Sequence, residues 1–213
     1  MSQARRYVDE PATPAPQRPR SPGRPRDPQA ERRILDAAIE EYIERGAAGF
    51  TMDRVARRAG VGKSTMYLRW SDKDALLVDS VMARSGSIEQ VDTGSLRGDL
   101  ILLSSNLFRF LLDPVGFATF RITVDSVGND ARRLVAADLA ERHRASAALV
   151  FQRAHERGDH FDPDAAPLVV ECLYGAISMR VLAAGFGSRP TDELITAACE
   201  QIVDLLLSAL LPD

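Results

Sequence analysis

Residues 51–70 constrain the fold of this chain more than any other stretch, because they predict two short helices joined by a tight glycine turn. Val55, Ala56 and Ala59 place apolar atoms on one face of the first helix. Gly60 then supplies the left-handed backbone that ends a helix. The pattern predicts a helix-turn-helix, a geometry that can place its second helix in the major groove of DNA.

The second helix is expected at about residues 63–69. Met66 and Trp70 continue the apolar face of the motif, so polar and cationic side chains are left on the outside. These outer residues are Lys63, Ser64, Thr65, Tyr67 and Arg69. Hydroxyl, phenol, ammonium and guanidinium groups suit phosphate oxygens and base edges. A helical hairpin with a solvated polar face is the alternative interpretation of the same pattern.

Segment 60–76 resembles the signature of the TetR family of bacterial transcription regulators. The resemblance covers about residues 30–77. It rests on Gly60-Val61 at the turn, Thr65-Met66-Tyr67, an aromatic residue at 70, Lys73-Asp74-Ala75-Leu76, the Thr51–Ala56 segment, and the upstream apolar residues Ile34, Leu35, Ala38 and Phe50. Arg69 stands where this family often has His or Tyr, and Trp70 replaces the usual Phe. Both departures bear on base preference.

The resemblance implies an all-helical protein of about nine helices, with an N-terminal helix-turn-helix domain and a C-terminal domain that binds an effector and dimerises. By match to the family motif, the phosphate anchors are Thr51, Thr65, Tyr67 and Lys73. Lys63, Ser64 and Arg69 are candidates for base edges or adjacent phosphates. The implied partners are a palindromic or pseudo-palindromic DNA operator, a small-molecule effector of unknown identity and a second copy of the chain.

The implied function is that of a ligand-responsive transcription regulator, usually a repressor in this family, released from its operator by a small apolar or amphipathic molecule. The distribution of charge along the chain agrees with this function. Residues 1–80 hold 15 Lys and Arg against 12 Asp and Glu, whereas residues 81–213 hold 12 against 18. A basic first part suits DNA, and an acidic remainder should avoid phosphate. A ligand-independent architectural DNA-binding protein is the alternative, and an enzyme is the least favoured class.

Residues 1–27 are rich in Pro and Arg and have almost no large apolar residues, so we expect a disordered basic arm. Within it, Gly23-Arg24-Pro25-Arg26 resembles the core of an AT-hook. Arg24 and Arg26 are therefore candidates for a narrow minor groove. A basic tail with only nonspecific attraction for phosphate is the alternative.

We expect a helix-turn-helix domain at residues 28–74 and an effector-binding and dimerisation domain at 75–213, with a helix over 72–86 as connector. Ser71 with Asp74 predicts a capping box at the start of that helix. The later helices are expected at about 96–112, 115–127, 131–157, 164–185 and 191–211. No β alternation of useful length is present.

The helix expected over 164–185 is apolar on nearly every side, so it must be covered on every side. With the helix after it, it could form a four-helix interface between two copies of the chain, as two DNA half-sites require. The candidate interface residues are Leu173, Ala176, Ile177, Arg180, Leu194, Ala198, Ile202 and Leu205. The alternative, that this helix is the internal spine of the domain, is compatible with dimerisation.

Large apolar residues on the middle helices suggest an effector pocket, although core packing explains each of them equally well. The candidates are Phe108, Phe117, Phe120, Phe151, His155 and Tyr174. Cys172 and Cys199 are expected to be buried as small hydrophobes. We expect no metal, cofactor or catalytic site, because the three histidines are not at metal spacing with the cysteines. Without an apolar run of about 18 residues or an apolar leader, a cytoplasmic protein is expected.

Overall fold

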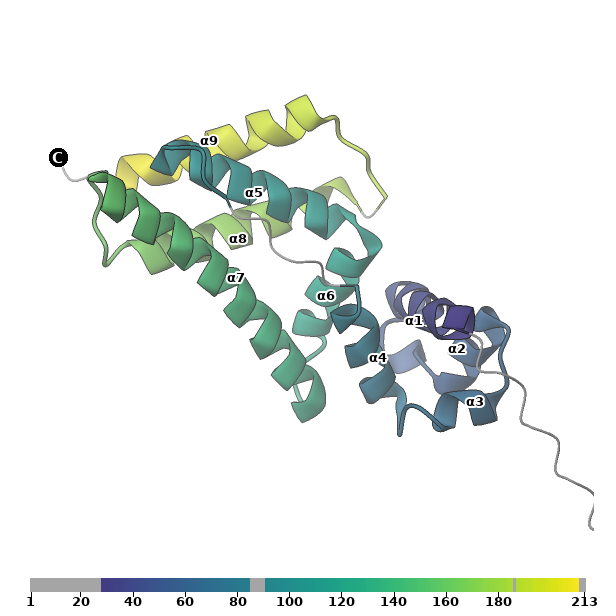
Figure 1. The fold of residues 1–213 in the computed structure, drawn as a ribbon. Helices are drawn as coiled ribbons and strands as arrows, with labels where there is room; N and C mark the ends of the chain where they lie inside the picture. The colour runs from purple at the N-terminus through teal and green to yellow at the C-terminus, as the bar shows by residue number, and fades with distance from the viewer. Residues whose placement is uncertain (1–27, 85–90, 186, 211–213) are drawn as a thin grey trace, which may run out of the picture.

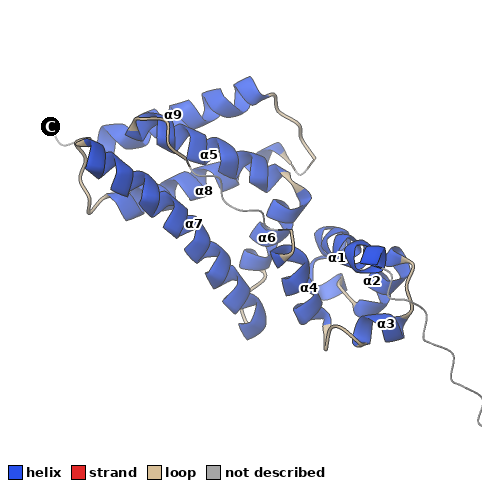
Figure 2. Cartoon of the chain, in the orientation of Figure 1, coloured by secondary structure: helices blue, strands red, loops and turns tan. Residues whose placement is uncertain are grey.

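The computed structural model describes residues 28–84, 91–185 and 187–210, and in these residues all regular structure is helical (Figures 1 and 2). The described helices are α1 (Pro28–Gly49), α2 (Met52–Ala59), α3 (Lys63–Tyr67), α4 (Lys73–Met82), α5 (Leu96–Leu112), α6 (Pro114–Val124), α7 (Asp130–Arg157), α8 (Ala166–Ala184) and α9 (Asp192–Leu210). The predicted all-helical class is confirmed, and so are the predicted bounds of α5.

Local signals set the ends of α2. The Thr51 hydroxyl accepts a hydrogen bond from the Arg54 N–H at 3.4 Å, which caps the first turn. Gly60 has φ 67°, the left-handed conformation that lets its own N–H return to the last carbonyls of the helix. Within α1, Gly46 interrupts the helical backbone with φ 62°. The chain then adds a further turn to Gly49, which delivers buried Phe50 to the core.

The cap of α4 differs from the prediction. Asp72, not Ser71, is the capping residue, and its carboxylate accepts a hydrogen bond from the Ala75 N–H at 2.8 Å. Ser71 instead donates its hydroxyl proton to Asp72 at 3.1 Å. The bond from the Ala75 N–H, then that from Ser71, lowers the pKa of Asp72. A charged carboxylate is the stronger acceptor at a helix N-terminus, which explains why it displaces the serine.

The buried apolar residues form two clusters. The first holds α1 to α4 together around Tyr42, Phe50, Met66 and Leu76. The second lies among α5, α7, α8 and α9. Ala118 and Ile122 of α6 belong to the first cluster, although α6 follows α5 in the chain. Figure 1 shows α6 between the two groups of helices, so it links the helix-turn-helix to the remaining helices.

The corner between α5 and α6 is sharp, with the two helices bent by 88°. Asp113 ends α5 and caps α6, because its carboxylate accepts a hydrogen bond from the Val115 N–H at 2.8 Å. A Cβ atom at position 116 would overlap the Phe110 carbonyl, so the close approach at this corner requires Gly116. This corner fixes the direction in which α6 runs toward α1.

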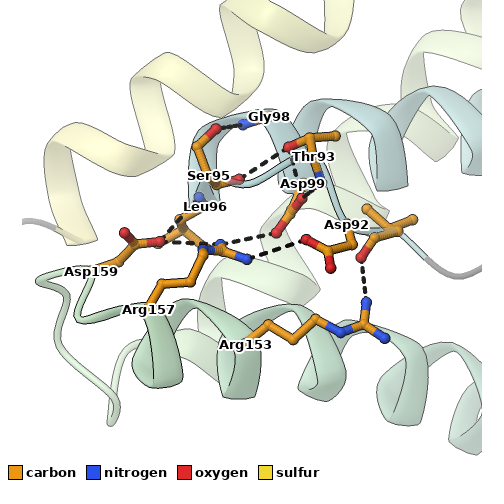
Figure 3. A network of polar contacts seen from close by, with 10 residues as sticks. Asp92, Thr93, Ser95, Leu96, Gly98, Asp99, Arg153, Arg157 and Asp159 are labelled. Carbon is orange, nitrogen blue, oxygen red and sulfur yellow. Dashed lines mark hydrogen bonds and ion pairs between the residues drawn. The ribbon is translucent and has the colours of Figure 1, made fainter.

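A polar network ties the start of α5 to the end of α7 (Figure 3). Asp99 is 0% exposed, and its carboxylate accepts hydrogen bonds from the Thr93 N–H at 2.5 Å, the Thr93 hydroxyl at 2.7 Å and Arg157 at 3.0 Å. Arg157 also pairs with Asp92 and Asp159, and Arg153 donates to the Val91 carbonyl. The segment 91–95 is thereby fixed to the second group of helices.

Candidate nucleic-acid interface

The predicted contact residues of α3 lie together on its outer surface. Lys63, Ser64 and Thr65 are exposed, and Tyr67 is 56% exposed. On the other side, Met66 and Trp70 are buried in the first apolar cluster. The geometry gives one short helix whose inner side is held by the core and whose outer side carries hydroxyl, phenol and ammonium groups. Such groups can donate to phosphates and base edges.

Leu68, which was not predicted as a contact residue, is 86% exposed at the end of α3. Its position in the sequence could have indicated this, because it lies four residues after Ser64 and three after Thr65. Residues at these spacings share one face of a helix. An apolar side chain on a DNA-facing surface suits the methyl group of thymine.

Both cations at the ends of α3 are paired with carboxylates from other helices. Lys63 lies 2.5 Å from Asp53 of α2, and Arg69 lies 2.5 Å from Glu31 in the first turn of α1. Neither partner was predicted from the sequence. The two ion pairs reduce the positive charge that this surface presents to phosphate.

The remaining predicted contacts are placed differently. Lys73, at the first position of α4, donates from its Nζ to the Ala47 carbonyl at 3.2 Å. Thr51 is exposed, and its hydroxyl oxygen accepts the capping bond of α2, which leaves its proton available to a phosphate. Arg24 and Arg26 lie outside the described residues.

The recognition helix α3 is supported from both sides. Arg58 of α2 binds three carboxylates of α1, at 3.1 Å for Glu40, 2.9 Å for Glu41 and 2.6 Å for Glu44. The hydrogen bond from Arg58 lowers the pKa of Glu44. On the other side, the Trp70 indole donates to Asp79 of α4 at 2.9 Å. The Arg58 contacts fix α2 on α1, and the Trp70 bond fixes the turn after α3 to α4.

Polar contacts also connect the helix-turn-helix with α6 and the start of α7. Arg121 donates to the Ile43 carbonyl at 2.5 Å, and the Tyr42 hydroxyl donates to Asp125 at 2.9 Å. Burial, and then this bond to Asp125, raises the pKa of Tyr42. Arg132 donates to Asp74 of α4 at 3.0 Å. The two groups of helices are therefore joined by directed bonds as well as by apolar packing.

Two of the predicted effector residues line an apolar depression between α5, α6 and α8. It has an empty volume of about 170 Å³, part of it open to solvent, and its lining residues are Leu111, Phe117, Phe120, Ser178, Val181 and Leu182. Phe117 and Phe120 therefore lie side by side at this depression. Phe108 and Phe151 are buried in the second apolar cluster, and His155 is exposed. Tyr174 is half-buried, with its ring 6.1 Å from that of His143.

The predicted dimer residues divide into two groups. Leu173, Ile177 and Ile202 are buried within the subunit's own core, while Ala176 and Ala198 are half-buried against that core. The candidates on the outside are Arg180, Leu194 and Leu205. Exposed large apolar residues that were not predicted are Leu168, Met179 and Leu182. α8 and α9 therefore do expose large apolar side chains, but these are only partly the predicted ones.

Two family models match the sequence. That of bacterial regulatory proteins of the tetR family matches residues 34–79, which contain the helix-turn-helix. That of the tetracyclin repressor-like C-terminal domain matches residues 90–205, more than half of the chain. The chain belongs to the TetR family.

Relatives of this TetR-family chain match nearly its whole length. The HTH-type transcriptional regulator AqdR of Rhodococcus erythropolis is 29% identical over 177 residues, 83% of each chain. A TetR regulator structure from Agrobacterium tumefaciens has a TM-score of 0.67 at 18% identity, covering 85% of this chain and 94% of that one. FadR of Bacillus subtilis, solved with stearoyl-CoA, has a TM-score of 0.66 at 19% identity, with 84% and 98% covered. The chain is a DNA-binding transcriptional regulator.

In this TetR-family regulator, α8 is long and apolar enough to cross a membrane by length and composition, and α5 with α6 would qualify together as a bent pair. Core helices have the same composition, and α8 buries Val169 and Val181 in its own subunit. Only 33% of the most apolar window is buried in the single chain. The outward apolar surface of α8 therefore lacks a partner within the described residues.

The cysteines of α8 and α9 differ in exposure. Cys172 is exposed in the single chain, contrary to the prediction, whereas the adjacent Leu173 is buried. Cys199 is buried as predicted, and burial raises the pKa of its thiol. Among the described residues, no group of three or more His, Cys, Asp or Glu side chains could hold a metal ion.

Proposed function

We propose that this TetR-family regulator is a homodimeric, cytoplasmic repressor that leaves its operator when a small apolar or amphipathic molecule binds between α5, α6 and α8. The observation that carries the proposal is the placement of α6. This single helix lines the apolar depression with Phe117 and Phe120 and is bonded to α1 through Arg121.

The two sides of α6 provide a route from effector to DNA. Phe120 and Arg121 are adjacent in the chain, so a ligand that shifts the backbone of α6 at Phe120 also shifts Arg121. Arg121 holds the Ile43 carbonyl, and the C-cap residue Asp125 holds the Tyr42 hydroxyl. A shift of α6 therefore changes the position of α1 and of the helix-turn-helix packed on it. A ligand regulates in this way only if it binds the shifted state more tightly.

A second route passes through α4. Arg132, near the start of α7, binds Asp74, which directly follows Lys73, one of the proposed phosphate anchors. The proposed division into an arm (1–27), a DNA-binding domain (28–74) and an effector domain (75–213) places α4 as the connector. Leu76 and Leu77 of α4 pack in the first apolar cluster, so α4 moves with the helix-turn-helix.

Dimerisation is supported by unpartnered apolar side chains at matching positions of α8 and α9. Leu168 and Met179 are eleven residues apart on α8, as are Leu194 and Leu205 on α9. Eleven residues correspond to about three helical turns, so each pair lies on one face. All four side chains are more than half exposed. A second copy of the chain would cover both faces and set two α3 helices about 34–36 Å apart, the spacing of successive major grooves.

The depression indicates the chemistry of the effector. Its lining is apolar except for the Ser178 hydroxyl, which is buried and has no hydrogen-bond partner among the residues that the structure describes. The depression encloses no space large enough for a water molecule, so a ligand can bind here only if the site opens. An extended hydrocarbon chain with a polar group fits this description. The solved relative FadR, which holds stearoyl-CoA, makes acyl compounds the first probes.

The test begins with selection of a duplex from a random library by the full chain. Stearoyl-CoA, free stearate and decanoate are then screened for a thermal shift, and affinity for the selected duplex is measured with each stabilising compound. We expect a 5- to 150-fold weakening, as for an allosteric coupling of about 1–3 kcal/mol. The variant Phe120→Ala should lose this response and keep its affinity for the duplex. If stabilising compounds leave that affinity unchanged, the architectural, ligand-independent alternative is favoured.

A further inference from the structure

The ion pair between Glu31 and Arg69 joins the start of α1 to the turn after α3. Glu31 Oε2 lies 2.5 Å from Arg69 Nη1, although the two residues are 38 positions apart. Glu31 keeps 53% of its side chain exposed, so the pair lies at the surface and not in the core. Arg69 directly follows the exposed residues Tyr67 and Leu68 at the end of α3 in the chain.

A carboxylate at this place has a cost for a DNA-binding surface, because it repels phosphate. The same carboxylate can also orient the guanidinium of Arg69. The guanidinium of Arg69 has five N–H donors in a fixed planar fork, and the bond to Glu31 occupies one of them. A free arginine explores many rotamers, whereas one held at Nη1 presents its remaining donors in a defined direction. Two such donors match the O6 and N7 atoms of guanine.

We propose that Glu31 is a positioning residue that holds Arg69 for contact with a guanine and so contributes to operator specificity. The inference rests on DNA binding through α3 and is independent of repression, dimer geometry and effector. Without Glu31, Arg69 would reach any nearby phosphate, which raises affinity for all DNA. With Glu31 in place, Arg69 should bind DNA favourably chiefly where a guanine accepts two hydrogen bonds from its guanidinium.

The second ion pair of α3 provides a matched control. Lys63 and Asp53 also lie 2.5 Å apart, and both side chains are exposed. An ammonium group is a point charge on a flexible stem and has no fork to direct. Neutralising Asp53 should therefore change the attraction for phosphate as neutralising Glu31 does, but without a comparable change in base discrimination.

The experiment uses the full chain, a duplex selected by the wild-type protein, every single base-pair substitution of one half-site, and a scrambled duplex. Glu31→Gln should bind the scrambled duplex several-fold more tightly and lose discrimination of one G·C pair by roughly 5- to 150-fold, the range for one bidentate contact. Arg69→Lys, which keeps the charge and loses the fork, should lose discrimination at the same base pair. Asp53→Asn should tighten binding to all duplexes and keep the discrimination.

The double variant shows whether Glu31 acts through Arg69, because the two substitutions should then not add in their effects on base discrimination. In the double variant Glu31→Gln, Arg69→Lys, discrimination at that base pair should be no lower than in Arg69→Lys alone, because Glu31 acts through Arg69. If Glu31→Gln keeps full discrimination, or loses it at a base pair that Arg69→Lys does not affect, the inference is wrong. Failure of the wild type to select any duplex would instead contradict DNA binding itself. Melting temperatures should be unchanged in all variants, since exposed ion pairs contribute little to stability.

Discussion

The buried carboxylate of Asp99 offers a test of what holds segment 91–95 against α7. In Asp99→Asn, the amide oxygen can still accept both donors of Thr93, which lie at 2.5 and 2.7 Å. The amide nitrogen then faces Arg157, where the wild type has a charged hydrogen bond of 3.0 Å. A donor therefore meets a donor at a position that is 0% exposed, and water cannot replace the lost bond without a rearrangement.

The expected magnitude follows from this single lost contact. A hydrogen bond to a charged group contributes about 1.5–3 kcal/mol to the free energy of unfolding. For a chain of this length each kcal/mol changes the melting temperature by about 2–4 °C. Asp99→Asn should therefore melt about 3–12 °C below the wild type. Differential scanning calorimetry of the full chain measures the difference directly.

Asp92→Asn is the matched control, because Asp92 pairs with the same arginine, at 3.6 Å, but is 60% exposed. We expect it to change stability by less than about 0.5 kcal/mol, as for most surface substitutions. Both variants should bind a selected DNA duplex with wild-type affinity, since the network lies far from α3 in the fold (Figure 1). Equal melting temperatures for the two variants would refute the reasoning that burial of Asp99 makes its bond to Arg157 matter.

Four further outcomes are expected. Tyr42→Phe should cost about 1.5–3 kcal/mol at pH 8, for a lost bond to a carboxylate. The pKa of Tyr42 is raised in the folded state, so the stabilisation from its neutral hydroxyl is complete below pH 10 and is lost as the pH rises further. Denaturant titrations at pH 8, 10 and 11 should therefore show a steeper fall in the free energy of unfolding for the wild type than for Tyr42→Phe. Gly116→Ala should destabilise by about 1–3 kcal/mol, since its Cβ would overlap a backbone carbonyl; an unchanged melting temperature would mean that the corner relaxes freely. Met179→Asp should sediment as a folded monomer, whereas a persisting dimer would place the interface elsewhere. Removal of residues 1–26 should weaken binding to every duplex and lower the log–log salt slope by about 0.9 for each lost phosphate contact, and an unchanged slope would mean that the arm does not touch DNA.

The sequence predicted best where a local signal decides the structure. Thr51 and Gly60 set the ends of α2, and Asp113-Pro114 sets the boundary between α5 and α6, because caps, left-handed glycines and prolines act within a few residues of themselves. The same local logic failed for Ser71, since two adjacent side chains could cap α4 and the charged one did. Local chemistry specified that a cap exists there, but not which residue provides it.

The orientation of α8 could not be predicted in the same way. A helix that is apolar on nearly every side gives no periodic signal for its inner face. Leu173 and Ile177 are predicted interface residues and Cys172 a core residue, whereas in the single chain Leu173 and Ile177 are buried and Cys172 is exposed. Only the positions of α5 and α9, which pack against α8, decide which side is the inner one.

Contacts between distant segments had no sequence signal at all. Glu31 and Arg69 are both charged residues on helix surfaces, for which solvation is the ordinary expectation. The bond between Arg121 and the Ile43 carbonyl could not be predicted either, because every residue has a backbone carbonyl and the sequence does not show which one a side chain will bind. The effector candidates could not be separated from core residues by sequence, since aromatic side chains are typical of both a core and a pocket. Of the six candidates, Phe117 and Phe120 line the depression.

These long-range pairs suggest how affinity and specificity are divided along the chain. On α3, Lys63 is paired with Asp53 and Arg69 with Glu31, so the recognition surface offers less attraction for phosphate than its sequence alone implies. Residues 1–26 contain six arginines against two acidic residues, Asp9 and Glu10, and residues 11–26 contain no carboxylate. Attraction to any DNA can therefore come mainly from the arm, where charge needs no fixed geometry. Discrimination can then come from α3, where carboxylates hold the cations in place and binding depends on the bases that they meet.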